Sequence, residues 1–344
     1  MKLSIVIICW NDRKYLATCL ESIYAYTQGL DFEIIVADNG STDGSLDLVR
    51  AHFPEVLVVE NGRNMGFGPG NNGGIRTARG EYVLLLNPDT YLRSGALEKW
   101  IAYADRHPQA GAFGCRTLNE DGSLQITAQP LPTVFRYFCK AICLRWPGLV
   151  FDALQVDKYL GWDGSTDREI GFQAGCTLLL RRELLQQLEG FDERFHHQYE
   201  DADLCCRVWK AGYAVRFCPA AEIVHIGGVN RGGYPIKVIL ETERGKYKYF
   251  HKHFGLRGAK RLRWISLFAF SLRYLGFRLR DLIKSGASNR NEVELYRTLL
   301  KWNWHLDAER FIANGTEPDL GYAPLMTVAA SGSPAHAEKS LSRS

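Results

Sequence analysis

The sequence lacks any run of 18 apolar residues, so we expect no transmembrane helix. It also has no CxxC pair, and its nine cysteines, an odd number, lie mostly inside apolar runs. This usage is typical of reduced core thiols in a cytosolic protein. The sequence also has no large excess of positive or negative charge. The net charge of +4 is too small to imply a nucleic-acid partner.

No small-residue cleavage site follows the apolar amino terminus, residues 1–10. The apolar run stops at Asn11-Asp-Arg, so we expect a first buried strand there and not a signal peptide. What the chain does have is length and apolar content. Its 344 residues, 46% of them hydrophobic, suffice for one large domain, or for one domain with a smaller appendage.

Strand and helix patterns alternate along the chain. Continuous apolar, β-branched runs predict strands buried on both faces, and helical spacing of apolar residues predicts the helices between them. The predicted strands are residues 3–9, 32–37, 56–59, a fourth within 80–90, 110–115, 171–180, 214–218 and 221–226, and the predicted helices are 12–26, 45–52, 95–106 and 182–188. This rhythm predicts an α/β fold with a parallel, doubly wound sheet.

Polar residues follow two of these strands. Asp38 ends the second strand and Asn87-Pro-Asp89 ends the fourth, and such sheets bind ligands at the carboxyl ends of their strands. A formal GxGxxG at Gly68, Gly70 and Gly73 follows the third strand and contains a proline. A dinucleotide site would follow the first strand, so we interpret residues 66–72 as a flexible loop that leads into a helix at 73–78.

Three carboxylates, Glu200, Asp201 and Asp203, fall in the first turn of a predicted helix that stops at Gly212. One interpretation is structural, because acidic residues there cap backbone amides and offset the helix dipole. The other is catalytic, because closely spaced carboxylates raise one another's pKa, as a general base requires. The cluster alone leaves both open.

The later part of the chain changes character. Residues 130–161 are irregular and rich in aromatic and basic residues, which suits either a packed excursion or a loop facing an acceptor or a membrane. Residues 234–254 and 292–311 have helical patterns. Residues 257–284 form a basic amphipathic pattern, which suits a helix in an anionic lipid interface or one packed on the main domain with a solvated rim.

Six motifs stand in order along the chain: Cys9-Trp-Asn11, Asp38-Asn-Gly-Ser-Thr-Asp-Gly-Ser45, Asn87-Pro-Asp89, Gly190-Phe-Asp-Glu-Arg-Phe195, Glu200-Asp-Ala-Asp-Leu-Cys-Cys-Arg207 and His225. Taken together, they resemble the inverting family 2 glycosyltransferases of the GT-A fold, and most of all their bacterial rhamnosyltransferase group. The resemblance covers about residues 2–254. It implies a nucleotide-binding domain at 1–255, with a mostly parallel central sheet flanked by helices. We expect basic amphipathic helices at 256–313 and a disordered tail at 314–344.

The resemblance implies a donor site for a nucleoside-diphosphate sugar. Asp38 would contact the base, with Trp10 and Asn11 in the loop beside it, and Asn87 would face the ribose. Arg231, in the glycine-rich stretch 227–233, would hold the diphosphate by a bidentate contact or, alternatively, form a surface salt bridge.

The resemblance also implies a metal ion and a base. Asp89 would bind Mg²⁺ or Mn²⁺, and His225 matches the late histidine that completes the metal site in relatives. Asn87 departs from the usual aspartate of the family's DxD motif, which implies weaker metal binding or a site made by Asp89, His225 and the donor's phosphates. Asp201 would be the general base.

The expected activity is transfer of a sugar, such as L-rhamnose from dTDP-L-rhamnose, to a hydroxyl of a lipid-linked or polysaccharide acceptor. We expect the enzyme at the inner face of the cell membrane, as a peripheral protein with no nucleic-acid partner. Alternatives are a transferase for another UDP- or dTDP-hexose, a nucleotidyltransferase and a non-catalytic carbohydrate-binding protein. The residues after the first strand, 9–13, lack the basic signature of a nucleotidyltransferase, and only Asn87 hints at a decayed site.

Overall fold

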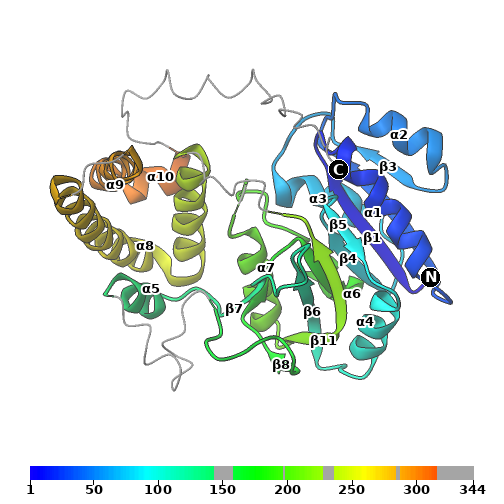
Figure 1. Cartoon of the computed structure of the whole chain (residues 1–344). Coiled ribbons are helices and arrows are strands. Elements are labelled where there is room, and N and C mark those ends of the chain that lie inside the picture. The colour runs from blue at the N-terminus through cyan, green and yellow to red at the C-terminus, as the bar shows by residue number, and fades with distance from the viewer. Residues whose placement is uncertain (143–157, 197, 228–235, 284–286, 316–344) are drawn as a thin grey trace, which may run out of the picture. The chain divides into compact units, whose positions relative to one another are not determined.

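The computed structural model describes residues 1–142, 158–196, 198–227, 236–283 and 287–315 (Figure 1). The chain divides into two compact units, Met1–Ala269 and Phe270–Ser344. The strands are β1 (Leu3–Cys9), β2 (Phe32–Asp38), β3 (Leu57–Glu60), β4 (Tyr82–Leu86), β5 (Thr90–Leu92), β6 (Ala110–Leu118), β7 (Ala128–Gln129), β8 (Arg168–Glu169), β9 (Phe172–Gln173), β10 (Thr177–Arg181) and β11 (Ala214–His225). The helices are α1 (Arg13–Tyr26), α2 (Ser45–His52), α3 (Phe67–Thr77), α4 (Ala96–Asp105), α5 (Val134–Ala141), α6 (Arg182–Gln187), α7 (Glu200–Lys210), α8 (Ile236–Ile283), α9 (Ala287–His305) and α10 (Ala308–Asn314).

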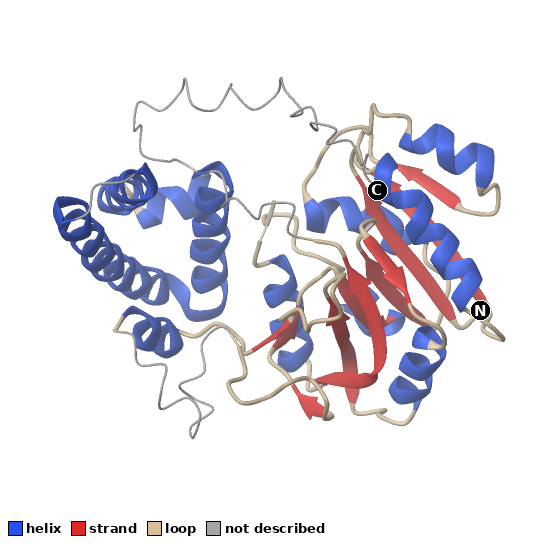
Figure 2. Cartoon of the chain, viewed as in Figure 1, coloured by secondary structure: helices blue, strands red, loops and turns tan. Residues whose placement is uncertain are grey.

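The first unit is built around one sheet flanked by helices (Figure 2), which confirms the predicted fold class. Its strand order is β3-β2-β1-β4-β10-β6-β11-β5, with β8 added beside β11. The first four strands are parallel, as predicted. The rest are mixed, because β10 runs antiparallel to both β4 and β6.

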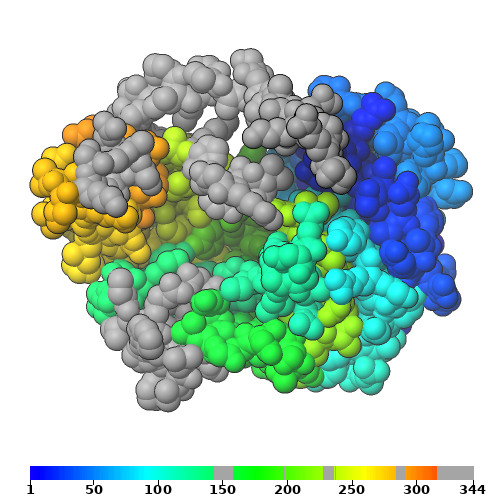
Figure 3. Space-filling view, viewed as in Figure 1, coloured from blue at the N-terminus to red at the C-terminus, as the bar shows by residue number. Residues whose placement is uncertain are grey.

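Strand β1 shows why the amino-terminal runs are continuously apolar. Leu3, Ile5 and Ile7 belong to a core that also holds side chains of α1, α2 and α4. Val6 and Ile8 point to the other face, where α3 packs. All seven residues of β1 are buried, because helices cover both faces of this part of the sheet. In the space-filling view, segments distant in sequence (blue, cyan and green) pack side by side at the surface of this unit (Figure 3).

Helix α3 corrects the predicted loop at residues 66–72, because it begins at Phe67. Its glycines allow close packing. A Cβ added at Gly70 would lie 2.5 Å from Cδ1 of Ile8, and one added at Gly74 would lie 2.6 Å from Cγ1 of Val6. Intrinsic propensity disfavours glycine in a helix. Here tertiary packing decides, since only a helix without side chains on this face fits so close to the sheet.

Two other predictions also need correction. The two short strands predicted at 214–226 are one strand, β11, with an irregularity in register between Cys218 and Glu222. Within the irregular segment 130–161 the described residues include helix α5, which Thr133 caps by accepting a hydrogen bond from the backbone N–H of Arg136. The sequence analysis missed the helical spacing of Val134, Phe135, Phe138 and Cys139, with Arg136 and Lys140 on the other side.

The helices after β11 fall in the predicted helical segments, but they are interrupted at additional residues. Within α8, Gly255 has a φ of 67°, so α8 consists of two helices joined at this glycine. The single helix predicted at 292–311 is α9 followed by α10, whose first turn is capped by Asp307. No helix within the described ranges is long and apolar enough to cross a membrane. The predicted disordered tail lies, beyond Gly315, outside the described residues.

Because α3 packs closely on the sheet, a glycine-to-alanine change in this helix should destabilise the protein, although alanine has the higher helix propensity. Gly74→Ala should lower the free energy of unfolding by about 1–2 kcal/mol, because overpacking against Val6 outweighs the gain in helix propensity. Gly276→Ala is the control: Gly276 is helical and a Cβ there meets nothing within 4 Å, so this change should stabilise by about 0.5–1 kcal/mol. Urea unfolding measures both, and equal stabilisation by both changes would contradict the packing argument.

Candidate active site

The carboxyl ends of β1, β2 and β4 form one edge of the sheet (Figure 1). Cys9 of β1 pairs in register with Asp38 of β2, and the N–H of Asn39 donates to the carbonyl of Cys9 at 2.8 Å. Strand β4 lies on the other side of β1 and ends at Leu86. The register therefore brings the loops after these three strands together, as the sequence predicted from strand ends.

The loops after β1 and β2 are held by their own polar side chains. Asp38 is 2% exposed, and its carboxylate accepts hydrogen bonds from the N–H groups of Gly40 at 2.9 Å and Ser41 at 3.0 Å. Oδ1 of Asn11 accepts from the N–H of Thr42 at 2.8 Å. Trp10 beside them is 52% exposed. Asp38 and Asn11 thus shape the loops, and the exposed indole is the group available to stack on a base.

Asp12 is a neighbour of this edge that the sequence analysis missed. Its carboxylate accepts from the N–H of Trp10 at 3.1 Å. Burial raises the pKa of Asp12, and the negative charges of Asp89 and Asp43 raise it further. The carboxylates of Asp12 and Asp89 therefore lie close enough to repel each other, which makes this end of the sheet a concentrated negative field.

Asp89, Asn87 and His225 come together as predicted. Strands β5 and β11 are antiparallel and pair Thr90 with His225, so the histidine lies next to the residue after Asp89. Nε2 of His225 is 3.2 Å from Oδ1 of Asp89 and 3.4 Å from Nδ2 of Asn87. Burial alone would raise the pKa of Asp89, but the hydrogen bond and charge of His225 outweigh burial and hold that pKa below its usual value.

The donor atoms here fit a divalent cation. Oδ1 of Asn87 is buried and has no hydrogen-bond partner within the described part of the chain, and Nδ2 of the same amide lies 3.4 Å from Nε2 of His225. Oxygen and imidazole nitrogen atoms are suitable ligands for Mg²⁺ or Mn²⁺. The described ranges contain no group of three or more His, Cys, Asp or Glu side chains placed to hold a metal. A cation here would therefore need further ligands from a bound molecule.

A turn between β9 and β10 joins Asp201 to this cluster. The N–H of Gly175 donates to Oδ2 of Asp201 at 3.2 Å, and the carbonyl of the next residue, Cys176, accepts from the N–H of Asn87 at 3.0 Å. Burial raises the pKa of the Cys176 thiol to about 12, and both Asp89 and Asp201 contribute through their charges. Asp201 therefore lies in the same site as Asp89.

The three carboxylates of α7 have different surroundings. Asp203 is fully buried and contacts Arg207 at 2.8 Å, Lys252 at 2.7 Å and His253 at 2.8 Å. Although burial alone would raise the pKa of Asp203, these partners hold it below the usual value. Its function is structural: it fastens α7 to the first part of α8.

Glu200 and Asp201 differ in access. Glu200 is 6% exposed, and burial, followed by the charge of Asp201, raises its pKa well above the usual range. Its burial therefore favours the neutral form of the carboxyl group. Asp201 is partly exposed, and burial raises its pKa to about 6, against which the N–H groups of Ala202 and Gly175 act. Of the cluster, Asp201 alone combines a raised pKa with access from outside.

Arg231 lies in residues 228–235, outside the described residues. The described cysteines are all buried and form no disulfide, as predicted from their apolar surroundings.

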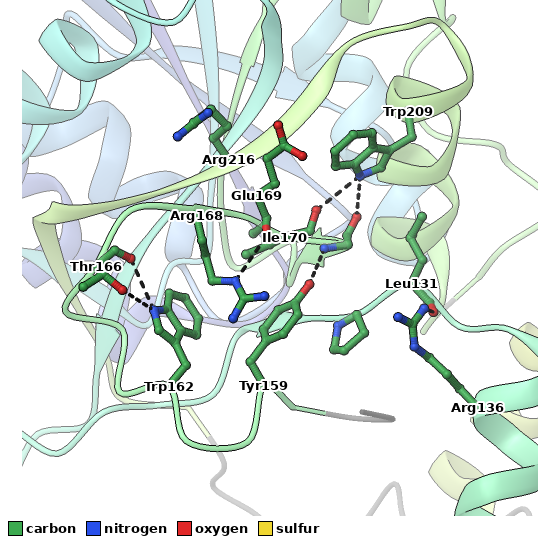
Figure 4. A pocket seen from close by; sticks show the side chains of 12 residues that line it. Leu131, Arg136, Tyr159, Trp162, Thr166, Arg168, Glu169, Ile170, Trp209 and Arg216 are labelled. Atoms are coloured by element: carbon green, nitrogen blue, oxygen red, sulfur yellow. Dashed lines mark hydrogen bonds between the residues drawn. The ribbon is translucent and has the colours of Figure 1, made fainter. Parts of the chain in front are cut away.

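A separate cavity of about 720 Å³ lies at the opposite end of α7 (Figure 4). Trp209 in its wall is eight residues beyond Asp201, roughly 12 Å along the helix. The guanidinium of Arg168 lies 3.9 Å from the ring centre of Tyr159 and 5.3 Å from that of Trp162. None of the predicted site residues lines this cavity.

Known protein families and relatives match most of this sequence. The sequence matches the model of Glycosyl transferase family 2 over residues 4–188, more than half of the chain, and that of Glycosyl transferase family group 2 over residues 164–285. It is 29% identical over 284 residues to an N-acetylglucosaminyl-diphospho-decaprenol L-rhamnosyltransferase of Mycobacterium tuberculosis, covering 79% of this chain and 91% of that protein. It is 25% identical to Rhamnosyltransferase WbbL of Escherichia coli K12, covering 64% of this chain and 82% of that protein.

Two solved structures share the fold. One is a mannosyltransferase of Pyrobaculum calidifontis in complex with GDP-Man and Mn²⁺, with a TM-score of 0.56, 17% identity, and coverage of 92% of this chain and 88% of that chain. The other is GalNAc-T7 with UDP, GalNAc and Mn²⁺, with a TM-score of 0.53, 15% identity, and coverage of 92% and 58%. The predicted family and fold are confirmed: the chain is a rhamnosyltransferase-like glycosyltransferase of family 2, with the GT-A fold.

Proposed function

We propose that this enzyme transfers a hexose, with L-rhamnose from a dTDP donor as the first candidate, to a hydroxyl of a lipid-linked or polysaccharide acceptor. The named rhamnosyltransferase relatives support the sugar, and the decaprenol-linked substrate in the name of one of them supports the acceptor. The observation that carries the proposal is the turn at Gly175–Cys176. It connects a carboxylate of raised pKa, Asp201, to the strand edge where Asn87 and Asp89 lie.

The donor would lie along the edge formed by β1, β2 and β4. Trp10 would stack on the base, within loops that Asp38 and Asn11 hold in place. Asn87 would face the ribose. A nucleotide with its diphosphate near Asp89 brings negative charge to a site already rich in carboxylates. This repulsion is the physical reason to expect a cation.

Asp89 and His225 would hold Mg²⁺ or Mn²⁺ together with the donor's phosphates. When bound, such a cation neutralises the charge that develops on the leaving diphosphate. The neutral amide of Asn87, in place of a carboxylate, leaves the protein's contribution to affinity small. The donor and the cation should therefore bind cooperatively.

Asp201 would act as the general base. It would accept the proton of the acceptor hydroxyl as the oxygen attacks the anomeric carbon opposite the diphosphate. A single in-line displacement inverts the anomeric configuration. A pKa of about 6 suits this step, because the carboxylate is charged near neutral pH and is still basic enough to share the proton in the transition state.

Substitution of Asp201 should separate chemistry from binding. Asp201→Asn should lower kcat by about 10²–10⁴-fold, the usual contribution of a general base, and leave the Kd of the donor nearly unchanged. Glu200→Gln, which replaces a buried carboxyl group by a neutral amide, is the matched control and should cost far less. In the wild type, kcat should fall as the pH drops below about 6, because protonated Asp201 cannot accept a proton. Equal loss of transfer and donor binding in Asp201→Asn would contradict the assignment.

Thermal unfolding with nucleotides tests the donor and cation sites. A ligand that binds only the native state raises the Tm in proportion to its occupancy. We expect dTDP with Mn²⁺ to raise the Tm more than the sum of the shifts with either alone, and chelation of the metal should remove most of the increase. Asp89→Asn should abolish this synergy and keep the small shift with nucleotide alone. A larger shift with UDP or GDP would assign another donor.

A second part of the proposal concerns the membrane, and it rests on α8. In the Phe270–Ser344 unit, five apolar side chains recur at helical spacing and are 49–88% exposed: Leu272, Leu275, Leu279, Leu282 and Ile283. At 100° per residue they share one face roughly 100° wide. Phe270 and Phe277, on the opposite face, pack on Tyr296 of α9 at ring distances of 6.1 and 5.7 Å. The apolar stripe therefore faces away from α9.

Arginines border this stripe on both sides. Arg280 and Arg273 fall about 110° and about 130° from its centre on one side, and Arg278 falls about 90° from it on the other. An apolar face edged by cations is the pattern of a helix that lies in an anionic lipid interface. This pattern supports the proposal that the enzyme is a peripheral protein on the inner face of the cell membrane, where a lipid-linked acceptor would be available.

Vesicle binding tests the stripe. The wild type should cosediment with vesicles that contain phosphatidylglycerol, and much less with pure phosphatidylcholine. Leu275→Glu with Leu279→Glu should weaken this binding by more than about tenfold, because burial of one leucine contributes about 1.5–3 kcal/mol. Trp304→Glu, at an exposed aromatic residue of α9, is the control. If the stripe instead mediates self-association, the double substitution will change the oligomeric state, and the wild type will bind neither kind of vesicle.

A further inference from the structure

The hairpin after β6, residues 119–125, contacts the ring of His225 on the side away from Asp89. Leu118 and Leu124 form an antiparallel bridge, and the N–H of Asn119 donates to the carbonyl of Ser123 at 2.8 Å. At its end, Oε1 of Gln125 lies 2.6 Å from Nδ1 of His225. No catalytic or binding group proposed above lies in this hairpin.

The hydrogen bonds of the hairpin have a direction that can be worked out. It begins at Asp121, because an ionised carboxylate only accepts. The hydroxyl of Ser123 donates to Asp121 at 2.5 Å, so its oxygen is left to accept from Nδ2 of Asn119 at 2.9 Å. That orientation turns Oδ1 of Asn119 toward Gln125, whose Nε2 donates to it at 3.0 Å.

The same orientation of Gln125 follows from a second contact. Its Nε2 also lies 3.4 Å from the backbone carbonyl of His225, which can only accept. Both neighbours of Nε2 are therefore acceptors, and the amide oxygen has to face the imidazole. An oxygen acceptor at 2.6 Å from Nδ1 requires the proton to be on Nδ1.

This tautomer has a consequence on the other side of the ring. With the proton on Nδ1, the neutral ring directs the lone pair of Nε2 to the carboxylate of Asp89, 3.2 Å away. Two acceptors at that distance repel each other unless a positive charge lies with them, either a second proton on Nε2, which then donates to Asp89, or a bound cation in the place of that proton. The arrangement is therefore suited to a cation that both atoms can bind.

We infer that Gln125 is a positioning residue, which accepts the Nδ1 proton of His225 and so keeps the Nε2 lone pair directed to a divalent cation at Asp89. This inference rests on the proposed role of His225 and Asp89 as cation ligands. Residues that fix the tautomer of a metal-binding histidine typically change metal affinity by about 10–100-fold when they are replaced. In this role Gln125 acts through the ring of His225.

The tautomer can be measured without metal. In metal-free protein labelled with ¹⁵N-histidine, two-bond ¹H–¹⁵N spectra distinguish a protonated ring nitrogen from one with a free lone pair, and His225→Gln identifies the resonance. The neutral imidazole ring of His225 in the wild type should show a protonated Nδ1 and an unprotonated Nε2. In Gln125→Leu a mixture should appear, because Nε2–H can then donate to Asp89. Gln125→Glu keeps an acceptor at Nδ1 and should restore the wild-type pattern.

Binding of Mn²⁺, alone and with dTDP, is measured on the same variants by electron paramagnetic resonance. Gln125→Leu should weaken binding by about 10–100-fold, Gln125→Glu should recover most of it, and Glu120→Ala, an exposed change in the same hairpin, should leave it unchanged. An Nε2–H tautomer in the wild type, or an unchanged tautomer and affinity in Gln125→Leu, would overturn the inference. The expected tautomers without any binding of Mn²⁺ to the wild type would support the role of Gln125 toward His225 but refute the cation site itself.

Discussion

The site depends on two hydrogen bonds made by one turn. The N–H of Gly175 holds the carboxylate of Asp201, and the carbonyl of Cys176 holds the backbone of Asn87. A Cβ at Gly175 would lie 2.7 Å from Cε1 of Phe67, so only glycine lets α3, the turn and α7 come this close. This turn is therefore the direct connection between the start of α7 and the end of β4.

Charge is distributed around this turn by what each carboxylate touches. The cations around Asp203 hold its pKa below the usual value, burial and the charge of Asp201 raise the pKa of Glu200 well above the usual range, and burial raises the pKa of Asp201 to about 6. Three residues in one helical turn thereby acquire different protonation behaviour. Sequence reasoning weighed capping against catalysis for the whole cluster, whereas the structure gives a separate answer for each residue.

Much of the fold and part of the site could be predicted from the sequence. Buried parallel strands can be recognised in a sequence as continuous apolar runs. The carboxyl ends of such strands lie at the same edge of the sheet, so the sequence predicted that Asp38 and Asn87 lie at one edge. Helix α3 could not be predicted, because its glycines are explained only by contact with Val6 and Ile8. Gln125 and Gly175 were missed because each acts through a hydrogen bond to a residue distant in sequence. The local sequence pattern around a residue does not indicate such a bond.

The attachment of α8 to α7 also limits how the chain can be shortened. Lys252 and His253 neutralise the fully buried carboxylate of Asp203, two positions after Asp201. A truncation that removes them leaves Arg207 as the remaining partner among these cations, and an undercompensated charge inside the protein costs several kcal/mol. The smallest autonomous fragment of the catalytic unit therefore has to extend past His253, even though the sheet itself is complete at His225.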